Sequence, residues 1–431
     1  MKKTLLSLAL LAASTCGFAQ DVNKMIVQDD VGRIIKTLSA DDMQGRATFT
    51  PGIDKAAKFI EGEFKIAGLK PLAGNVGFRQ NFKVLRSTPV KLTLGINGKS
   101  VAADSAFVTG GDSFNWATNA DVQVVQVTAD KDFRQEYGII TNSGKKSLVL
   151  VDPKFKGLFN RVREFSSRGS ITFKGKASAP VVFVLGSFEK VTAFDVSYET
   201  KSEELSLFNV AGVIPGKTKP NEFVVFSGHY DHLGILKPME GDSIANGADD
   251  DASGTTAVIS LAKYYKRLKN NARTLIFVAF CAEEIGGYGS QYFSGQVNPD
   301  KTVAMFNIEM IGKASKFGPN SAFITGYERS DFGKILQKNL DGTAFKFYPD
   351  PYPEQDLFYR SDNATLARLG VPAHTISTDQ IDIDKLYHTV KDEFSSLDVS
   401  NITLTIRAIA LSSRSIVAGK DTPTRIAKLE R

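Results

Sequence analysis

The chain has 431 residues, a length that indicates two or three domains, or one large domain with an insertion. Apolar residues make up 42% of it and charged residues 23%, which excludes a disordered or fibrous protein and fits a folded globular one. The formal net charge of +6 is spread along the chain without a basic cluster interleaved with aromatic residues, so nucleic acid is not an expected partner.

The first segment, 1–19, has the pattern of a secretory signal. Two lysines open it, an apolar run follows at 5–13, and small residues precede the expected cleavage after Ala19. The apolar run is too short for a permanent transmembrane anchor, and no later stretch has the necessary length. We therefore expect a periplasmic or secreted protein, with a lipoprotein linked through Cys16 as the alternative.

Residues 20–88 are predicted to begin the main domain, and two helices are expected there. Apolar residues recur at helical spacing in 27–38 and again in 53–67. Gly68 supplies a C-cap for the second helix, because glycine accepts the left-handed conformation at that position. A strand is expected to follow at 78–84.

Residues 89–204 differ from the rest of the chain in their pattern of predicted secondary structure. Short strand patterns separated by Gly, Asn and Asp predominate, and long helical patterns are scarce, so we predict an inserted β-rich domain. The expected strands lie at 91–96, 121–127, 146–151, 179–185 and 190–196.

Residues 205–431 return to alternating strands and helices and form the second part of the main domain. This alternation predicts an α/β fold with a mostly parallel central sheet and helices on both faces. The main expected elements are strands at 222–226, 274–281, 303–308 and 373–376, and helices at 252–268 and 402–416.

Candidate metal-binding side chains follow the expected strands of this last part. Because the carboxyl ends of parallel strands open into one crevice, residues placed there converge. Each motif alone has an ordinary explanation, such as capping of a helix by an aspartate run. Together they indicate one site, made of His229, Asp249, Glu283, Glu284, Glu309 and His388.

The chemistry of this set favours zinc. Two histidines with carboxylates and no cysteine suit zinc, and a carboxylate that bridges allows two ions. Two adjacent ions can activate water and polarise a carbonyl together. One member of the Glu283-Glu284 pair is then needed as a base that takes the proton of the water.

Several motifs resemble those of the M28 family of zinc-dependent aminopeptidases, in its exported bacterial form. The resemblance covers most of the mature chain outside the insert, which occupies the place where many members carry a protease-associated domain. The segments that carry it are LSADDMQGR at 38–46, GHYDHLG at 228–234, GADDDASG at 247–254, FVAFCAEE at 277–284, NIEMIG at 307–312 and YHT at 387–389.

The resemblance implies a role for each residue. His229 and Glu309 would be terminal ligands of one zinc, Glu284 and His388 of the other, and Asp249 would bridge them. The Asp249–Asp250 peptide would be cis, as it often is in the family.

Two further roles concern catalysis. Glu283 would be the general base, taking a proton from the bridging water, which becomes the attacking hydroxide, and passing that proton to the leaving amine. Asp231 would lie behind the ring of His229 and orient it.

Two departures from the family pattern bear on the site. The family usually has Asp where this chain has Glu309, and the extra methylene shifts the carboxylate that would bind the metal. The family often has His in a Ser-Asp-His motif, where this chain has Asn363 after Ser361 and Asp362. We expect that second change to affect specificity more than metal binding.

The remaining candidates have simpler expected roles. His232 is expected to lie near the metals without binding them, and His374 to pack in the core. Tyr387 is expected either to stabilise the reaction intermediate or to pack, and Arg360 to lie on the surface.

The sequence thus predicts an exported di-zinc aminopeptidase that removes N-terminal residues from peptides. A glutaminyl cyclase with one zinc on the same scaffold is the first alternative. A non-catalytic binding protein on the peptidase fold is the second.

Overall fold

The computed structural model describes residues 21–118, 120–176 and 178–429. The predicted signal segment, 1–19, lies outside the described residues, as does Cys16. Within the described ranges, no helix combines the length and the apolar character that crossing a bilayer requires.

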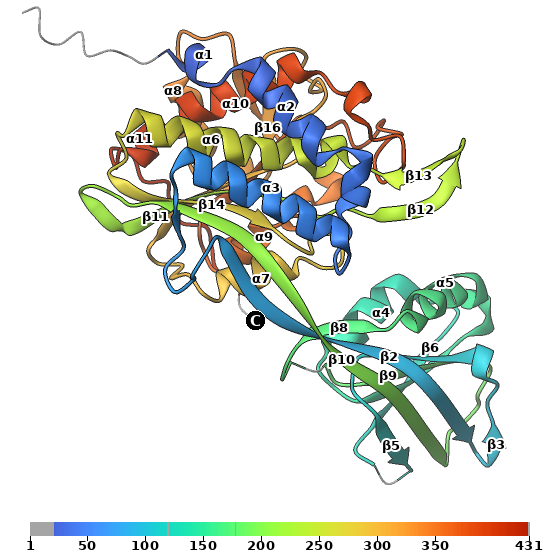
Figure 1. Ribbon diagram of the computed structural model, residues 1–431. Helices are drawn as coiled ribbons and strands as arrows, with labels where there is room; N and C mark the ends of the chain where they lie inside the picture. The colour runs from blue at the N-terminus through green and yellow to red at the C-terminus, as the bar shows by residue number, and fades with distance from the viewer. Residues whose placement is uncertain (1–20, 119, 177, 430–431) are drawn as a thin grey trace, which may run out of the picture. The chain divides into compact units, whose positions relative to one another are not determined.

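The chain forms two compact units (Figure 1). Met1–Asn81 and Leu207–Arg431 make up the first, and Phe82–Ser206 makes up the second. The predicted insert, 89–204, falls inside the second unit. The chain enters that unit along β2 and leaves it along β10, two long strands with the bounds Arg79–Ile96 and Phe194–Ile214.

The first unit is built on a mixed sheet in the order β17-β16-β18-β15-β11-β14-β10. Strand β11 lies parallel to both β14 and β15, and β15 lies parallel to β18, whereas β10 and β16 run antiparallel to their neighbours β14 and β18. The bounds are β11 Lys219–His229, β14 Arg273–Phe280, β15 Thr302–Ile308, β16 Ser321–Ile324, β17 Lys346–Pro349 and β18 Ala373–Ser377.

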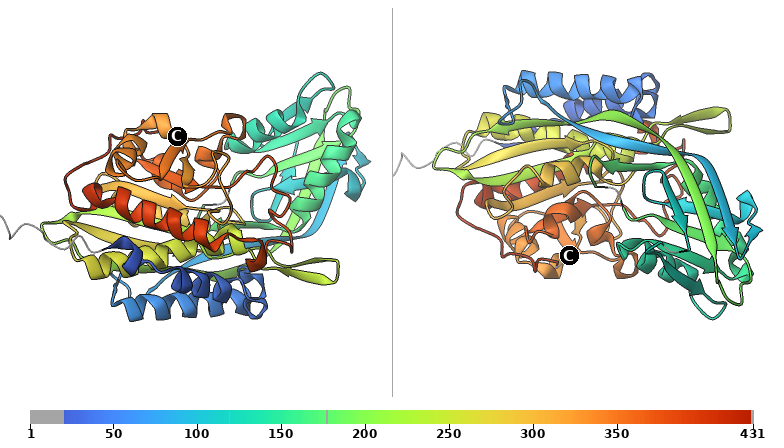
Figure 2. Two further views of the ribbon diagram at one scale, coloured as in Figure 1. Left: turned by 90° about the horizontal axis from the view of Figure 1, so that it is seen from above. Right: turned by 90° about the horizontal axis from the view of Figure 1, so that it is seen from below.

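Helices cover both faces of this sheet, as Figures 1 and 2 show. Helices α2, α3, α6 and α10 pack on one face, and α7 and α9 on the other. Their bounds are α2 Gln28–Leu38, α3 Pro51–Ala67, α6 Gly254–Leu268, α7 Tyr288–Ser294, α9 Asn363–Ala367 and α10 Val399–Ser412. The predicted fold class is confirmed.

Burial explains why these strands sit at the centre. Every residue of β14 is buried, as a strand covered on both faces requires. On one face the ring of Phe226 stacks between Phe277 and Phe306 of the neighbouring strands, at centroid distances of 5.3 and 4.8 Å. This packed layer holds the ends of β11, β14 and β15 in fixed register.

Short elements complete the first unit. Helix α3 ends at Gly68, which has φ 76° and so adopts the predicted left-handed cap. The remaining elements are α1 Val22–Met25, β1 Lys70–Pro71, the hairpin strands β12 Gly234–Met239 and β13 Asp242–Ala245, α8 Phe332–Asn339 and α11 Arg414–Val417.

The second unit contains a four-stranded sheet in the order β4-β9-β7-β6, whose last three strands are parallel. Helices α4 and α5, of 10 and 12 residues, also belong to this unit, and the sequence analysis did not predict them. The bounds are β3 Lys99–Ser100, β4 Ala106–Thr109, β5 Phe114–Ala117, β6 Gln123–Val127, α4 Phe133–Asn142, β7 Ser147–Val151, α5 Lys156–Ser167, β8 Ser170–Phe173 and β9 Val181–Leu185.

The missed helix α4 has a weak apolar pattern, since only Phe133 and Ile140 are buried. A start signal was nevertheless present in the sequence. Asp132 caps the helix by accepting hydrogen bonds from the backbone N–H groups of Arg134 and Gln135.

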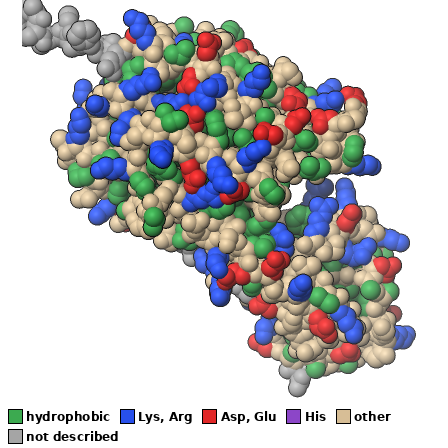
Figure 3. All heavy atoms as spheres, viewed as in Figure 1, with side chains coloured by type: hydrophobic (Ala, Val, Ile, Leu, Met, Phe, Trp, Pro, Cys, Tyr) green, Lys and Arg blue, Asp and Glu red, His purple; other side chains and the backbone are tan. Residues whose placement is uncertain are grey.

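The visible face of the molecule in Figure 3 shows acidic and basic side chains interspersed. This agrees with a net charge that is spread along the sequence.

Candidate active site

The site lies at the carboxyl edge of the central sheet of the first unit. His229 is the last residue of β11, Glu283 follows the end of β14, and Glu309 directly follows β15. Asp250 comes from the turn that enters α6, and His388 from a loop after β18. The order of the strands therefore brings together residues far apart in sequence.

The carboxylate of Asp250 lies between two imidazole rings. Its Oδ1 is 3.0 Å from Nε2 of His229, and its Oδ2 is 3.2 Å from Nε2 of His388. Ligand atoms of His229, Asp250 and Glu284 lie within 4.8 Å of one another. One carboxylate thus faces one nitrogen on each side, the arrangement of a bridging ligand.

The structure places Asp249 elsewhere, and this corrects the predicted bridge. Its Oδ1 accepts a hydrogen bond of 2.7 Å from the backbone N–H of Gly312, and its Oδ2 lies 3.3 Å from Nζ of Lys313. The cis peptide joins Asp250 to Asp251, one residue later than predicted. Consecutive aspartates point in different directions, and sequence spacing alone does not reveal which of them faces the histidines.

Two further acids, which sequence reasoning missed, hold this turn in place. The carboxylate of Asp392 accepts hydrogen bonds of 3.0 Å from the backbone N–H groups of both Asp249 and Asp250. The carboxylate of Asp251 accepts a bond of 3.1 Å from the backbone N–H of His229. The sequence could have pointed to Asp392, because it is an acidic residue only four positions after the proposed ligand His388.

Glu284 is held between two histidines. Its Oε2 is 3.1 Å from Nε2 of His388, and its Oε1 is 2.7 Å from Nδ1 of the buried His232. His232 therefore orients the carboxylate of Glu284 from the side opposite to His388.

Asp231 organises two parts of the site at once. Its two carboxylate oxygens accept hydrogen bonds from the backbone N–H groups of Glu283, at 3.1 Å, and Glu284, at 3.3 Å. Its backbone carbonyl lies 3.1 Å from Nδ1 of His229. Ala282, with φ 64°, breaks the extended backbone just before, which lets both glutamates face the site.

Glu283 and Glu309 are partly buried carboxyl groups that interact with His229. Burial raises the pKa of Glu283 well above its ordinary value, against the lowering effect of His229. Burial also raises the pKa of Glu309, whose carboxylate accepts hydrogen bonds from the side chains of Asn307 and Ser361.

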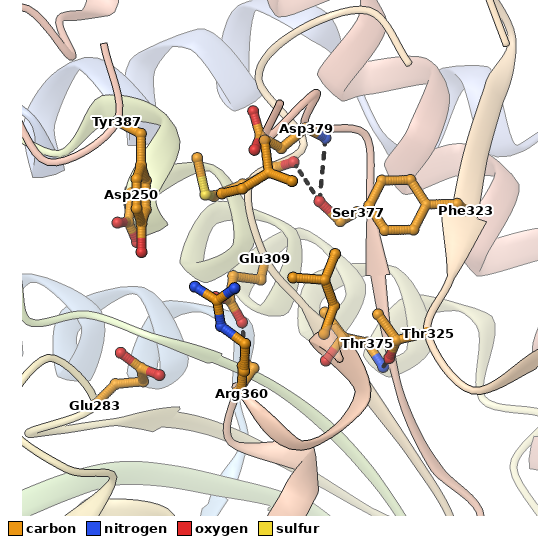
Figure 4. A pocket seen from close by; sticks show the side chains of 14 residues that line it. Asp250, Glu283, Glu309, Phe323, Thr325, Arg360, Thr375, Ser377, Asp379 and Tyr387 are labelled. Atoms are coloured by element: carbon orange, nitrogen blue, oxygen red, sulfur yellow. Dashed lines mark hydrogen bonds between the residues drawn. The ribbon is translucent and has the colours of Figure 1, made fainter. Parts of the chain in front are cut away.

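A pocket opens beside these acids, and Asp250, Glu283 and Glu309 line one side of it (Figure 4). Tyr387 lines the same side and stacks on His388, with ring centroids 3.8 Å apart.

His374 lies in the core, away from this group. Its ring nitrogens face the carbonyl oxygen of Thr325 and the hydroxyl of Ser330, each at 2.8 Å. Burial lowers the pKa of His374 to about 4, so the ring is neutral at ordinary pH.

The residues present fit zinc. The Nε2 atom of His232 is buried and has no hydrogen-bond partner among the described residues, and the Nε2 atoms of His229 and His388 both face the carboxylate of Asp250. Imidazole nitrogens and carboxylate oxygens converging on one point, without thiolates, form a donor set that zinc prefers. A cation there would also compensate the buried carboxylates.

Comparisons with known proteins agree with this geometry. Residues 209–412 match the model of Peptidase family M28. Leucine aminopeptidase 1 of Ajellomyces capsulatus strain H88 is 25% identical over 285 residues, covering 63% of this chain and 72% of its own. A probable zinc metalloprotease of Leptosphaeria maculans is 28% identical over 145 residues, which are 33% of this chain and 32% of that protein.

Two solved structures share the fold. The aminopeptidase from Aneurinibacillus sp. strain AM-1 has a TM-score of 0.55 at 17% identity, covering 95% of this chain and 97% of its own. BSAP, a zinc aminopeptidase from Bacillus subtilis, has a TM-score of 0.54 at 14% identity, covering 94% and 99%. Fold, residue set and relatives together define a zinc peptidase. Residues 209–412 of this chain are similar to peptidase family M28, and the predicted resemblance is confirmed.

Proposed function

We propose that this protein is an exported aminopeptidase that uses two zinc ions to release N-terminal residues from peptides. The observation that carries the proposal is the carboxylate of Asp250, which has His229 on one side and His388 on the other. The names of the relatives and of the structural neighbours support the aminopeptidase activity. Export rests on the signal pattern of residues 1–19.

The site offers two sets of ligands that share one carboxylate. His229 and Glu309 would hold one zinc, Glu284 and His388 the other, and Asp250 would contribute to both. Bound zinc supplies Lewis-acid polarisation of a carbonyl and lowers the pKa of water toward neutrality.

Side chains of this protein transfer and donate the protons of the reaction. Glu283 takes the proton of the attacking water and delivers it to the nitrogen of the leaving amine. Its buried position suits this role, since a carboxyl group with a raised pKa can hold that proton between the two steps. The Tyr387 hydroxyl, whose pKa burial raises, stays protonated and can donate to the developing oxyanion.

The test measures metal content and hydrolysis on the same sample. We expect two zinc ions per chain, loss of aminoacyl-coumarin hydrolysis on chelation, and recovery on adding zinc. Glu283→Gln should keep its zinc while kcat falls by about 10²–10⁴-fold. The same change at exposed Glu328 is the control and should leave kcat unchanged.

Two outcomes would contradict the proposal. Near-wild-type turnover in Glu283→Gln would remove Glu283 from the role of base. One zinc per chain, with pyroglutamate formed from a peptide that begins with Gln, would identify a cyclase instead.

A further inference from the structure

The pocket beside Glu283 has walls of two kinds. Apolar side chains from four different segments of the chain form part of its lining. Ser377, the last residue of β18, and Asp379, two residues further on, contribute polar groups (Figure 4). The apolar lining residues are Met310, Phe323, Leu357 and Ile381.

Asp379 is an unusual lining residue, because it is 4% exposed and neither of its carboxylate oxygens has a hydrogen-bond partner among the described residues. Its backbone is fixed: its N–H donates to Oγ of Ser377 at 3.1 Å, and that hydroxyl donates to the carbonyl of Met310 at 3.0 Å. A buried carboxylate without a partner is costly, which indicates that a ligand completes it.

The nearest lysine is already engaged. Nζ of Lys313 lies 2.5 Å from Asp384 and 3.3 Å from Asp249. Carboxylate oxygens of Asp249, Asp379 and Asp384 lie within 4.8 Å of one another, so three acids share one ammonium group. A hydrogen bond between Asp379 and Asp384 would require one of them to hold a proton. The pocket therefore borders more acidic groups than this one ammonium group can neutralise.

We propose that this pocket receives the side chain of the substrate's N-terminal residue and that Asp379 selects lysine and arginine. The inference rests on the proposed aminopeptidase function. Glu283 and Asp250 line the same pocket, so a peptide whose first carbonyl lies beside them directs its first side chain inward. The methylene groups of lysine would pack on the apolar walls while the ammonium group meets the carboxylate.

Arg360 also lines the pocket and carries the opposite charge. It is exposed, its Nη1 lies 3.3 Å from Oε1 of Gln355, and Figure 4 shows its guanidinium group near Glu309, away from Asp379. The cationic group therefore lies on the Glu309 side of the pocket, and the unpartnered acid borders another part of it.

The experiment compares lysine with norleucine, which has the same chain of methylene groups but no ammonium group. We expect kcat/KM of the zinc-loaded enzyme to be at least about tenfold higher for lysyl- than for norleucyl-coumarin at about pH 8.5. Asp379→Asn should lower kcat/KM for lysine by about 10–100-fold and change that for norleucine by less than about threefold. Asp379→Glu should restore part of the preference.

Asp382→Asn is the matched control, because Asp382 is exposed and does not line the pocket. It should keep the wild-type ratio of lysine to norleucine. Thermal unfolding of each variant with zinc bound checks that its fold is intact.

Three outcomes would overturn the inference. Norleucine or leucine preferred over lysine by the wild-type enzyme would exclude basic selection while leaving the aminopeptidase function standing. If Asp379→Asn lowers kcat/KM equally for lysine and norleucine, the carboxylate instead binds the α-ammonium group of the substrate or supports the fold. A calcium-induced rise in the thermal midpoint, absent in Asp379→Asn, would place a metal ion there. Failure to cleave any aminoacyl substrate would instead contradict the proposed function itself.

Discussion

The two sides of the pocket are built differently. On the metal side, two of the proposed ligands have fixed partners: Asp392 holds the backbone of Asp250, and His232 orients the carboxylate of Glu284. On the opposite side, Asp379 is equally buried but its carboxylate has no hydrogen-bond partner among the described residues. Preorganised ligands suit a permanent cofactor, because the geometry must exist before the ion arrives. A buried carboxyl group without a partner suits a ligand that binds and dissociates.

The largest expected effect tests which aspartate belongs to the metal side. Asp250→Asn should remove at least one zinc ion per chain and lower kcat/KM by more than the 10–100-fold that is typical of residues behind a ligand. Asp249→Asn should keep both ions, because the carboxylate of Asp249 faces Gly312 and Lys313. Metal analysis after gel filtration, with kinetics on the same sample, measures both effects. The reverse pattern would restore Asp249 as the bridge.

The next largest expected effect is on stability, and it concerns Arg46, which supports the metal side of the pocket. Arg46 is 1% exposed, and its guanidinium group donates only to backbone carbonyls, among them Tyr230 at 2.8 Å and Gly247 at 2.9 Å. It thereby ties the end of β11 to the turn that carries Asp250. Lysine lacks the planar fork, so Arg46→Lys should leave carbonyls unsatisfied and lower the free energy of unfolding by about 2–4 kcal/mol.

Chemical denaturation measures this loss, and Arg33→Lys provides the control. The side chain of Arg33 is 46% exposed and pairs with Asp30 and with the buried Glu63. Lysine keeps the charge that both pairs need, so this replacement should cost less than about 1 kcal/mol. Equal losses in the two variants would show that Arg46 has no special structural role.

The sequence predicted the metal side well because that side depends on strand ends. Several of its residues end or follow one of three parallel strands, whose order brings these residues to one edge: His229, Glu283, Glu284 and Glu309. Helices α2 and α3 were predicted within two residues of their bounds, since their apolar spacing and the cap at Gly68 are local signals.

The sequence did not predict the details that depend on long-range contacts. Which residue of the aspartate run faces the histidines is decided by a turn that Asp392 holds from more than a hundred residues away. No sequence motif marks the opposite side of the pocket, where Asp379 lies. Its residues Phe323, Leu357 and Asp379 come from separate segments and come together only in the folded chain. Local sequence patterns do not predict such long-range contacts.

The preference for lysine over norleucine should depend on pH, because it depends on the charge of Asp379. Burial raises the pKa of Asp379 to about 8; the neighbouring Asp249 and Asp384 add to this effect, and Lys313 opposes it. The carboxyl group is therefore neutral well below pH 8 and charged above it. Because lysine keeps its charge until about pH 10, the ratio of kcat/KM for lysine to that for norleucine should rise roughly tenfold from pH 7 to pH 9.

Both substrates carry the same α-amino group and use the same catalytic residues, so taking the ratio cancels other titrations. In Asp379→Asn the ratio should not vary with pH. A ratio that stays constant in the wild-type enzyme would show that Asp379 does not meet the ammonium group of lysine.

The smallest expected effect concerns Ser377, which supports Asp379 through its hydroxyl. That hydroxyl accepts from the N–H of Asp379 and donates to the carbonyl of Met310, so Ser377→Ala removes two hydrogen bonds without adding bulk. We expect the carboxylate to be held less firmly and the preference for lysine over norleucine to fall about three- to tenfold, as a loss of about 1 kcal/mol predicts. The change should appear in KM for lysine, with kcat nearly constant, since no group that moves a proton is altered. A fall in kcat for both substrates would instead show that Ser377 acts through Met310, which directly follows Glu309, and that the two sides of the pocket are not independent.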